Sequence, residues 1–159
     1  MIKKIFIFLF LSNFFIQCGF QPIYSDKNVT ISGDYETVLI SENSIAAKEA
    51  FSTIFKNTKK ESNYQLQIDI TEQDQPIVTN SDGTIAKYRI DISANFILFD
   101  KINNKEIFSD YSKGFAQYET QINEYDTEQK RNEAIEIATT NSLQIIPIKI
   151  QNFQSRKGE

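Results

Sequence analysis

The sequence has no histidine, no tryptophan and a single cysteine among its 159 residues. Histidine is the commonest general base in enzymes and the commonest protein ligand of transition metals, so its absence removes both functions. A single cysteine cannot form an internal disulfide bond or a cysteine-based metal site. The five glycines form no phosphate-binding loop, G-x-S-x-G nucleophile elbow or EF-hand loop. We therefore expect a protein that is not an enzyme and that needs no metal or cofactor.

Carboxylates are plentiful in the sequence. Asp69, Asp91 and Asp110 fall on predicted strands, where two of them could approach each other. A pair of carboxylic acids is sufficient for glycoside hydrolysis. The alternative is a solvated strand face, which we favour because no other feature marks two of these acids as a site.

The apolar stretch within residues 1–17 is too short to cross a membrane. Lys3 and Lys4 precede an unbroken apolar run from Ile5 to Leu11. The apolar positions number about a dozen, whereas a transmembrane helix needs ~20. A basic start followed by a short apolar region is typical of a secretory signal, so we expect residues 1–17 to be a lipoprotein signal peptide that is cleaved off. An uncleaved N-terminal anchor is the alternative.

Cys18 directly follows this region, at the position where lipoprotein processing attaches diacylglycerol and acyl chains. A cysteine that carries two or three acyl chains anchors a protein stably to a membrane. We therefore expect Cys18 to be the lipidation site and residues 18–34 to be an acylated linker. A buried, unmodified cysteine is the alternative. The residue before a lipidated cysteine is usually small, whereas this chain has Gln17 there.

The charge of the chain is acidic. Removal of residues 1–17 leaves 15 basic against 21 acidic residues. Such a chain repels nucleic acid and anionic lipid, so we expect no nucleic-acid partner, and an anionic lipid would need a local basic patch. Lys87 and Arg89 point the same way from a predicted strand and could hold lipid phosphates, with Arg89 binding in bidentate fashion. An ordinary charged strand face, with Asp91 as neighbour, is the alternative.

The first half of the domain predicts a strand, a helix and a second strand. Residues 35–40 are rich in β-branched and aromatic side chains, which favour a strand. Ser41 is a suitable N-cap for an amphipathic helix over residues 42–57, where apolar residues recur at helical spacing. Strict alternation of apolar and polar residues predicts the next strand over residues 64–71.

A loop and a hairpin follow. Residues 73–83 contain a proline and an Asp-Gly turn signal, and they predict a flexible loop. A long strand is predicted from about residue 84 to residue 99, on the same alternation. Residues 100–105 are polar and predict a hairpin turn into a strand over residues 106–118.

The strand over residues 106–118 is apolar on both of its faces. Its alternation places two groups of apolar side chains on opposite sides: Ile107, Tyr111 and Phe115 on one, and Phe108, Ala116 and Tyr118 on the other. A strand that is apolar on both sides is typically covered on both sides. We therefore expect one face to be covered by something outside this chain.

A helical pattern runs from about residue 126 towards the end of the chain, and Pro147 interrupts it. Proline lacks a backbone N–H, so the helix should kink at Pro147 or stop before it. The alternation of Ile146, Ile148 and Ile150 leaves a short strand as the alternative, but we favour a helix because the segment is long. Residues 155–159 predict a polar, disordered tail.

These elements follow the order β-α-β-β-β-α and predict an α+β fold over residues 35–154, in a single domain. Neither helix can bury its apolar stripe alone, and the sheet needs cover on one face. Two helices packed on one face of a four-stranded mixed sheet meet both requirements.

The start of the mature chain carries a resemblance to a known family. The run Cys18-Gly19-Phe20-Gln21-Pro22-Ile23-Tyr24 resembles the lipobox cysteine and following residues of the LptE family of lipopolysaccharide-assembly lipoproteins, in its alphaproteobacterial form. The strand over residues 88–99, the polar turn and Ala116-Gln117-Tyr118 are similar to that family's second half. So is Asn123-Glu124-Tyr125, which an acid-rich helix start over residues 128–133 follows.

The resemblance implies a lipoprotein anchored to the periplasmic side of the outer membrane. It implies that the protein plugs and helps assemble an LptD-type β-barrel, binds lipopolysaccharide and takes part in its transport to the cell surface. Gly19, directly after the cysteine, is compatible with sorting to the outer membrane. Lys87 and Arg89 remain candidate lipopolysaccharide-binding residues. The alternative function is a free-standing periplasmic lipoprotein that binds a lipid or another envelope ligand.

Overall fold

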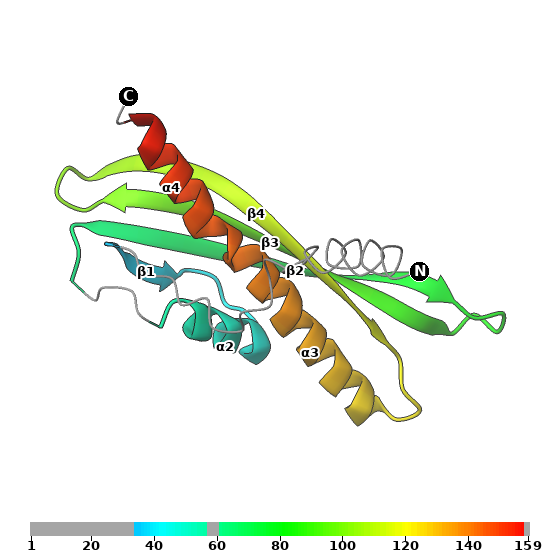
Figure 1. Ribbon diagram of the computed structural model, residues 1–159. Helices are drawn as coiled ribbons and strands as arrows, with labels where there is room; N and C mark the ends of the chain where they lie inside the picture. The colour runs from blue at the N-terminus through cyan, green and yellow to red at the C-terminus, as the bar shows by residue number, and fades with distance from the viewer. Residues whose placement is uncertain (1–33, 57–60, 158–159) are drawn as a thin grey trace, which may run out of the picture.

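The computed structural model describes residues 34–56 and 61–157, in which a four-stranded sheet carries helices on one face (Figure 1). In chain order the elements are β1 (Glu36–Leu39), α2 (Ile45–Ile54), β2 (Tyr64–Thr79), β3 (Ile85–Asp100), β4 (Lys105–Glu119), α3 (Glu124–Leu143) and α4 (Ile145–Lys157). The strand order in the sheet is β1-β2-β3-β4, with β1 parallel to β2 and the other neighbours antiparallel. The predicted α+β class, element order and mixed sheet are confirmed. The predicted signal peptide and most of the linker lie outside the described residues.

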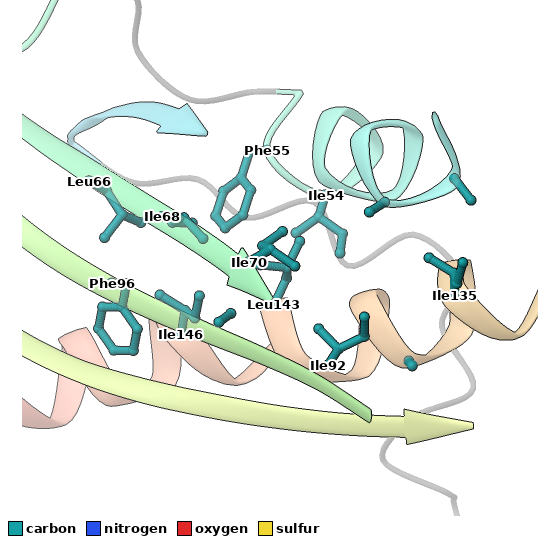
Figure 2. Close-up of a cluster of buried hydrophobic side chains, with 14 of the residues drawn as sticks. Ile54, Phe55, Leu66, Ile68, Ile70, Ile92, Phe96, Ile135, Leu143 and Ile146 are labelled. Carbon is teal, nitrogen blue, oxygen red and sulfur yellow. The ribbon is translucent and has the colours of Figure 1, made fainter. Parts of the chain in front are cut away.

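The core lies between the sheet and the helices (Figure 2). Alternate residues of β2 and β3 point into it, so that Leu66 lies opposite Leu98 and Ile68 lies opposite Phe96. The labelled side chains on the helix side are Ile54, Phe55, Ile135, Leu143 and Ile146. Each aliphatic or aromatic side chain that is fully buried in this way contributes about 1.5–3 kcal/mol to folding.

Helix α2 begins later than the sequence predicts. Ser41 does not cap it: the Ser41 hydroxyl accepts the Ile70 N–H at 2.9 Å, while the Asn43 side chain donates to the Ile70 carbonyl at 2.8 Å. These two side chains continue the pairing of β1 with β2 beyond the end of β1. The cap is instead Ser44, whose hydroxyl accepts the Ala47 N–H at 3.2 Å. The predicted helix over residues 42–57 is therefore too long at both ends, since α2 ends at Ile54.

The flexible loop predicted over residues 73–83 is wrong for most of its length. Strand β2 continues to Thr79, and only the residues between β2 and β3 form a turn, where Gly83 has a φ of 86°. Pro76 does not end the strand, because β1 pairs only with the start of β2 and no other described strand pairs with the later part of that edge. Proline is tolerated on such an edge, where its missing N–H breaks no ladder.

The C-terminal helical segment is interrupted, as its proline predicts. Helix α3 ends at Leu143 and α4 starts at Ile145, which places Pro147 in the first turn of α4. Backbone N–H groups in a first turn have no partner within the helix, so proline is accommodated there. A helix rather than a strand is confirmed over Ile146–Ile150. The helix continues to Lys157, so residues 155–157 are not the disordered tail that the sequence predicts.

Helix α3 lies directly against the backbone of β4 at Gly114. A Cβ atom at Gly114 would stand 2.1 Å from the Ala138 carbonyl oxygen and 2.7 Å from the Ser142 nitrogen. Beside it, the hydroxyls of Ser112 and Ser142 form a buried hydrogen bond of 3.1 Å. Glycine and serine at these positions bring the helix and the strand closer together than larger side chains would permit.

We predict that Gly114→Ala lowers the free energy of unfolding by at least about 3 kcal/mol, because the added methyl group meets backbone atoms that cannot move independently. The matched control is Gly83→Ala, where no atom lies within 4 Å of the added Cβ and only the positive φ is strained. That control should cost about 1 kcal/mol. Urea unfolding of both variants measures the difference, and equal costs would contradict the close contact.

Candidate interaction surface

The sheet face that points away from the helices is open. We call it the outer face and define it by three rows of side chains: Gln65, Gln67, Asp69, Thr71 and Gln73 on β2, Lys87, Arg89, Asp91, Ser93 and Asn95 on β3, and Ser109, Tyr111, Lys113, Phe115 and Gln117 on β4. None of these side chains is buried by any part of the chain that the structure describes. Most of them are neutral hydrogen-bonding groups, with the charges concentrated on β3 and β4.

The structure brings Lys87 and Arg89 together on the outer face, and it gives each of them an acidic partner. The Lys87 ammonium lies 3.5 Å from Glu119 across the β3–β4 pair. The Arg89 guanidinium binds one oxygen of Asp91, with Nη2 at 2.7 Å and Nε at 2.8 Å. Exposed ion pairs of this kind contribute at most about 1 kcal/mol, so a phosphate group could displace either carboxylate.

Arg89 also has an aromatic partner that sequence reasoning did not assign to it. Its Cζ atom lies 4.6 Å from the centroid of the Phe115 ring, within the range of a cation–π contact. The nearby Lys113 extends this arrangement, because its ammonium lies 5.5 Å from the Tyr111 ring. Lys113 was missed as a site residue, although its place between Tyr111 and Phe115 in a strand of period two already puts it on the same face.

The two faces of β4 are divided as the alternation predicts from Phe108 onwards. The predicted place of Ile107 beside Tyr111 and Phe115 is wrong, because the β3–β4 pairing shifts at this point and Ile107 lines a hollow with Leu98 and Phe153 on the helix side. Tyr111 and Phe115 are 53% and 57% exposed on the outer face, whereas Tyr118 is 7% exposed on the helix side. Phe108 also lies on the helix side, where its ring stacks on Phe153 of α4 at a centroid distance of 4.4 Å. The expectation that another molecule covers the exposed rings remains a prediction.

The three acids considered for hydrolysis do not converge. Asp110 points to the helix side, opposite Phe96, whereas Asp69 and Asp91 lie on the outer face. Asp91 is paired with Gln73, four residues along β2 from Asp69, which separates the two acids by roughly 13 Å at 3.3 Å per residue. Within the described residues, no group of three or more His, Cys, Asp or Glu side chains is placed to hold a metal ion.

Asp110 has a structural partner in α4. The Lys149 ammonium donates to the Asp110 carboxylate at 2.7 Å and to the Tyr111 carbonyl oxygen at 2.6 Å. The hydrogen bond from Lys149, a second from the Tyr111 N–H and the positive charge of Lys149 lower the pKa of Asp110 from its ordinary value. A general acid needs the opposite shift, so Asp110 is better explained as an anchor for α4.

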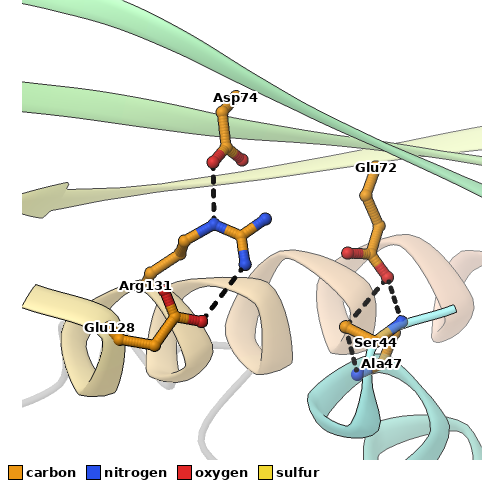
Figure 3. A network of polar contacts seen from close by, with 6 residues as sticks. All are labelled: Ser44, Ala47, Glu72, Asp74, Glu128 and Arg131. Atoms are coloured by element: carbon orange, nitrogen blue, oxygen red, sulfur yellow. Dashed lines mark hydrogen bonds and ion pairs between the residues drawn. The ribbon is translucent and has the colours of Figure 1, made fainter. Parts of the chain in front are cut away.

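The acidic side chains on the helix side of β2 accept hydrogen bonds from residues at the start of α2 and on α3 (Figure 3). Glu72 accepts hydrogen bonds from the backbone N–H and the hydroxyl of Ser44, at 3.1 and 2.9 Å, which places a negative charge at the start of α2. Asp74 accepts from Nε of Arg131 on α3 at 2.7 Å, and Arg131 also contacts Glu128 at 3.4 Å. These groups are engaged in packing and do not form a second candidate site.

Cys18 lies outside the described residues, so the structure says nothing of its surroundings. Across residues 34–56 and 61–157, every helix is too short or too polar to span a lipid bilayer.

No protein-family model matches the sequence, and no curated protein matches it significantly. The fold is shared with solved structures of bacterial lipoproteins. A Caulobacter crescentus CB15 protein that has been assigned as a lipoprotein superposes with a TM-score of 0.61 at 16% identity, over 78% of this chain and 92% of that chain. Rare lipoprotein B of Shewanella oneidensis gives 0.54 at 12% identity, over 78% and 99%. An uncharacterized lipoprotein B of Nitrosomonas europaea gives 0.54 at 14% identity, over 78% and 87%. At these low identities the TM-scores show a common fold and nothing further.

We predict that the Asp110–Lys149 contact makes the stability of the domain depend on pH. The pKa of Asp110 is lower in the folded than in the unfolded chain, so the contact stabilises above the ordinary carboxyl pKa of about 4 and is lost as the pH falls through the lowered value. Lys149→Met should cost up to about 1 kcal/mol at pH 7, since both side chains are partly exposed. Urea unfolding at a series of pH values should show this cost shrinking below pH 4. Lys48→Met, at an exposed position of α2, is the control and should show no such pH dependence.

Proposed function

We propose that this protein is a non-catalytic, LptE-like lipoprotein of the outer membrane, anchored through acylated Cys18. It plugs and helps assemble an LptD-type β-barrel and takes part in lipopolysaccharide transport. The observation that carries the proposal is the outer face, with its rows of amides and hydroxyls and its exposed rings on β4. The fold shared with bacterial lipoproteins and the start of the mature chain at Cys18–Tyr24 support the same proposal.

The composition of the outer face suits the inside of a barrel. The lumen of an outer-membrane β-barrel is polar, and its wall presents hydrogen-bonding and charged side chains. The amide and hydroxyl rows of β2 and β3 can form hydrogen bonds with such a wall. Tyr111 and Phe115 supply rigid rings, which are enriched at the centres of protein interfaces. In this proposal, the barrel wall is the external cover that β4 lacks.

Lys87 and Arg89 are the proposed contacts for the phosphates of lipopolysaccharide. Arg89 can present its planar guanidinium to a phosphate in bidentate fashion while it stays stacked on Phe115. Binding then replaces the Glu119 and Asp91 carboxylates by phosphate oxygens as the partners of Lys87 and Arg89.

We predict that the protein copurifies with a large outer-membrane β-barrel. A C-terminally tagged chain is isolated from its native membranes in mild detergent, and mass spectrometry identifies the copurifying proteins and the N-terminal peptide. A stoichiometric barrel together with acylated Cys18 is the expected result, because a plug does not leave its barrel under mild conditions. An acylated Cys18 without a barrel would favour the free-standing lipoprotein that binds an envelope ligand.

We also predict that the double charge reversal Lys87→Glu and Arg89→Glu weakens binding to vesicles that contain lipid A. Two charge-assisted contacts of about 1.5 kcal/mol or more each correspond to at least a tenfold loss of affinity. The control is Lys48→Glu with Lys56→Glu, which makes the same change of charge at exposed positions away from the outer face. Unchanged affinity in the first variant would leave Lys87 and Arg89 as ordinary solvated charges.

A further inference from the structure

One end of the domain is hollowed between α4 and the sheet. Two adjoining hollows of about 500 Å³ each lie there, and both are lined by Tyr64 of β2, Leu98 of β3 and Gln154 of α4. They form one trough that runs beneath α4, from the start of β1 to the turn between β3 and β4. No residue of helices α2 and α3 lines this trough in the part of the chain that the structure describes.

The trough is lined by both apolar and polar side chains, and the charged ones are Asp34, Asp100, Lys105 and Glu106. Ile150 and Phe153 project from α4 on one side, and the Tyr64 ring, which is 43% exposed, stands on the other. Gln151 and Gln154 lie along the rim. An open, partly apolar trough of this size gains free energy when apolar side chains fill it.

The described part of the chain begins beside this trough. Asp34 and Tyr35, the first residues that the structure describes, are part of its lining. The segment that precedes them begins at Cys18 and contains three large apolar residues near its start: Phe20, Ile23 and Tyr24. Tyr24 is ten residues before Asp34, a stretch that reaches up to about 33 Å when extended, so the segment is long enough to fold back into the trough.

We propose that Phe20, Ile23 and Tyr24 dock in the trough beneath α4. Residues 19–25 carry no charged side chain, so the segment itself brings no ion into the trough. Pro22 restricts the backbone between Phe20 and Ile23, which lowers the conformational entropy that docking removes. The amide side chains of Gln151 and Gln154 on the rim are placed to receive backbone groups of an extended segment.

Docking would fix how the domain stands relative to the membrane. Phe20 is two residues from Cys18, so an acyl chain on Cys18 would hold the α4 end of the domain at the membrane surface. The turn between β2 and β3 would then point away from it, because β2 has 16 residues and spans roughly 50 Å. This inference goes beyond the proposed function, since it requires no barrel and no lipopolysaccharide.

The test is disulfide trapping in the full-length protein, purified in mild detergent. Gln21→Cys is combined with Gln154→Cys on the rim, which leaves the three docking side chains intact. Mild oxidation should link the two introduced cysteines within one chain roughly tenfold faster than in a control that combines Gln21→Cys with Gln129→Cys on α3, because docking raises their effective concentration. Adding Phe20→Ser, Ile23→Ser and Tyr24→Ser should abolish this difference.

Three results would overturn the proposal. Equal rates for the two pairs would mean that the segment does not prefer the trough. Disulfides between chains, seen as dimers on a non-reducing gel, would mean that a second copy fills it. A difference that survives the three serine substitutions would assign the effect to the acyl chains or to chain length. Circular dichroism confirms that each variant is folded before its rate is compared.

Discussion

The contact between α3 and β4 is set by a residue that has no side chain. Gly114 leaves room for the backbone at Ala138 and Ser142, and Ser112 adds a buried hydroxyl pair with Ser142. Because the side chains of a strand alternate strictly, turning Gly114 and Ser112 towards α3 also turns their neighbours outwards. Lys113 is on the outer face for this reason, as are the two rings beside it. The packing requirement of the core thus determines which side chains form the interaction surface, and a slip of one residue in β4 would bury the charge and expose the contact.

The same register settles the electrostatics of that surface. Pairing of β3 with β4 brings Glu119 opposite Lys87 and places Arg89 beside Phe115. The cations are therefore present but compensated: one by a carboxylate across the strands, the other by Asp91 on its own strand. Because both cations are already paired, the surface does not attract anions unspecifically. Each ion pair is partly exposed and therefore weak, so its carboxylate can be exchanged for a better acceptor.

The strands and their faces were predictable from the sequence, because alternation is a pattern of a few neighbouring residues. Helix caps and ion pairs that depend on residues far away in the sequence were not predictable. The alternation in β2, β3 and β4 predicted these strands and the side on which Arg89 lies. Ser41 and Ser44 are equally good caps by composition. The choice between them rests on Ile70 and Glu72, which are more than 25 residues away and reach the two serines only after the sheet has formed. The ion partner of Lys87 depends on strand register in the same way.

The wrong prediction of a loop at the end of β2 has a physical origin, which also explains why β2 is so long. The loop was predicted from its proline and its Asp-Gly turn signal, but proline excludes only a strand that has neighbours on both edges. Here β2 continues past the core, and its inward positions change from isoleucine to Glu72 and Asp74. Asp74 reaches Arg131, and the Tyr88 and Tyr118 rings stack at a centroid distance of 5.2 Å, so polar and aromatic contacts are added here to the aliphatic packing of Ile90 and Ile92 on β3. Burial and the nearby charge of Asp74 raise the pKa of Tyr118 to about 12, so this phenol stays neutral. The sheet is thereby divided into a part with an aliphatic core and a long polar hairpin, and local opening is expected to begin in the hairpin.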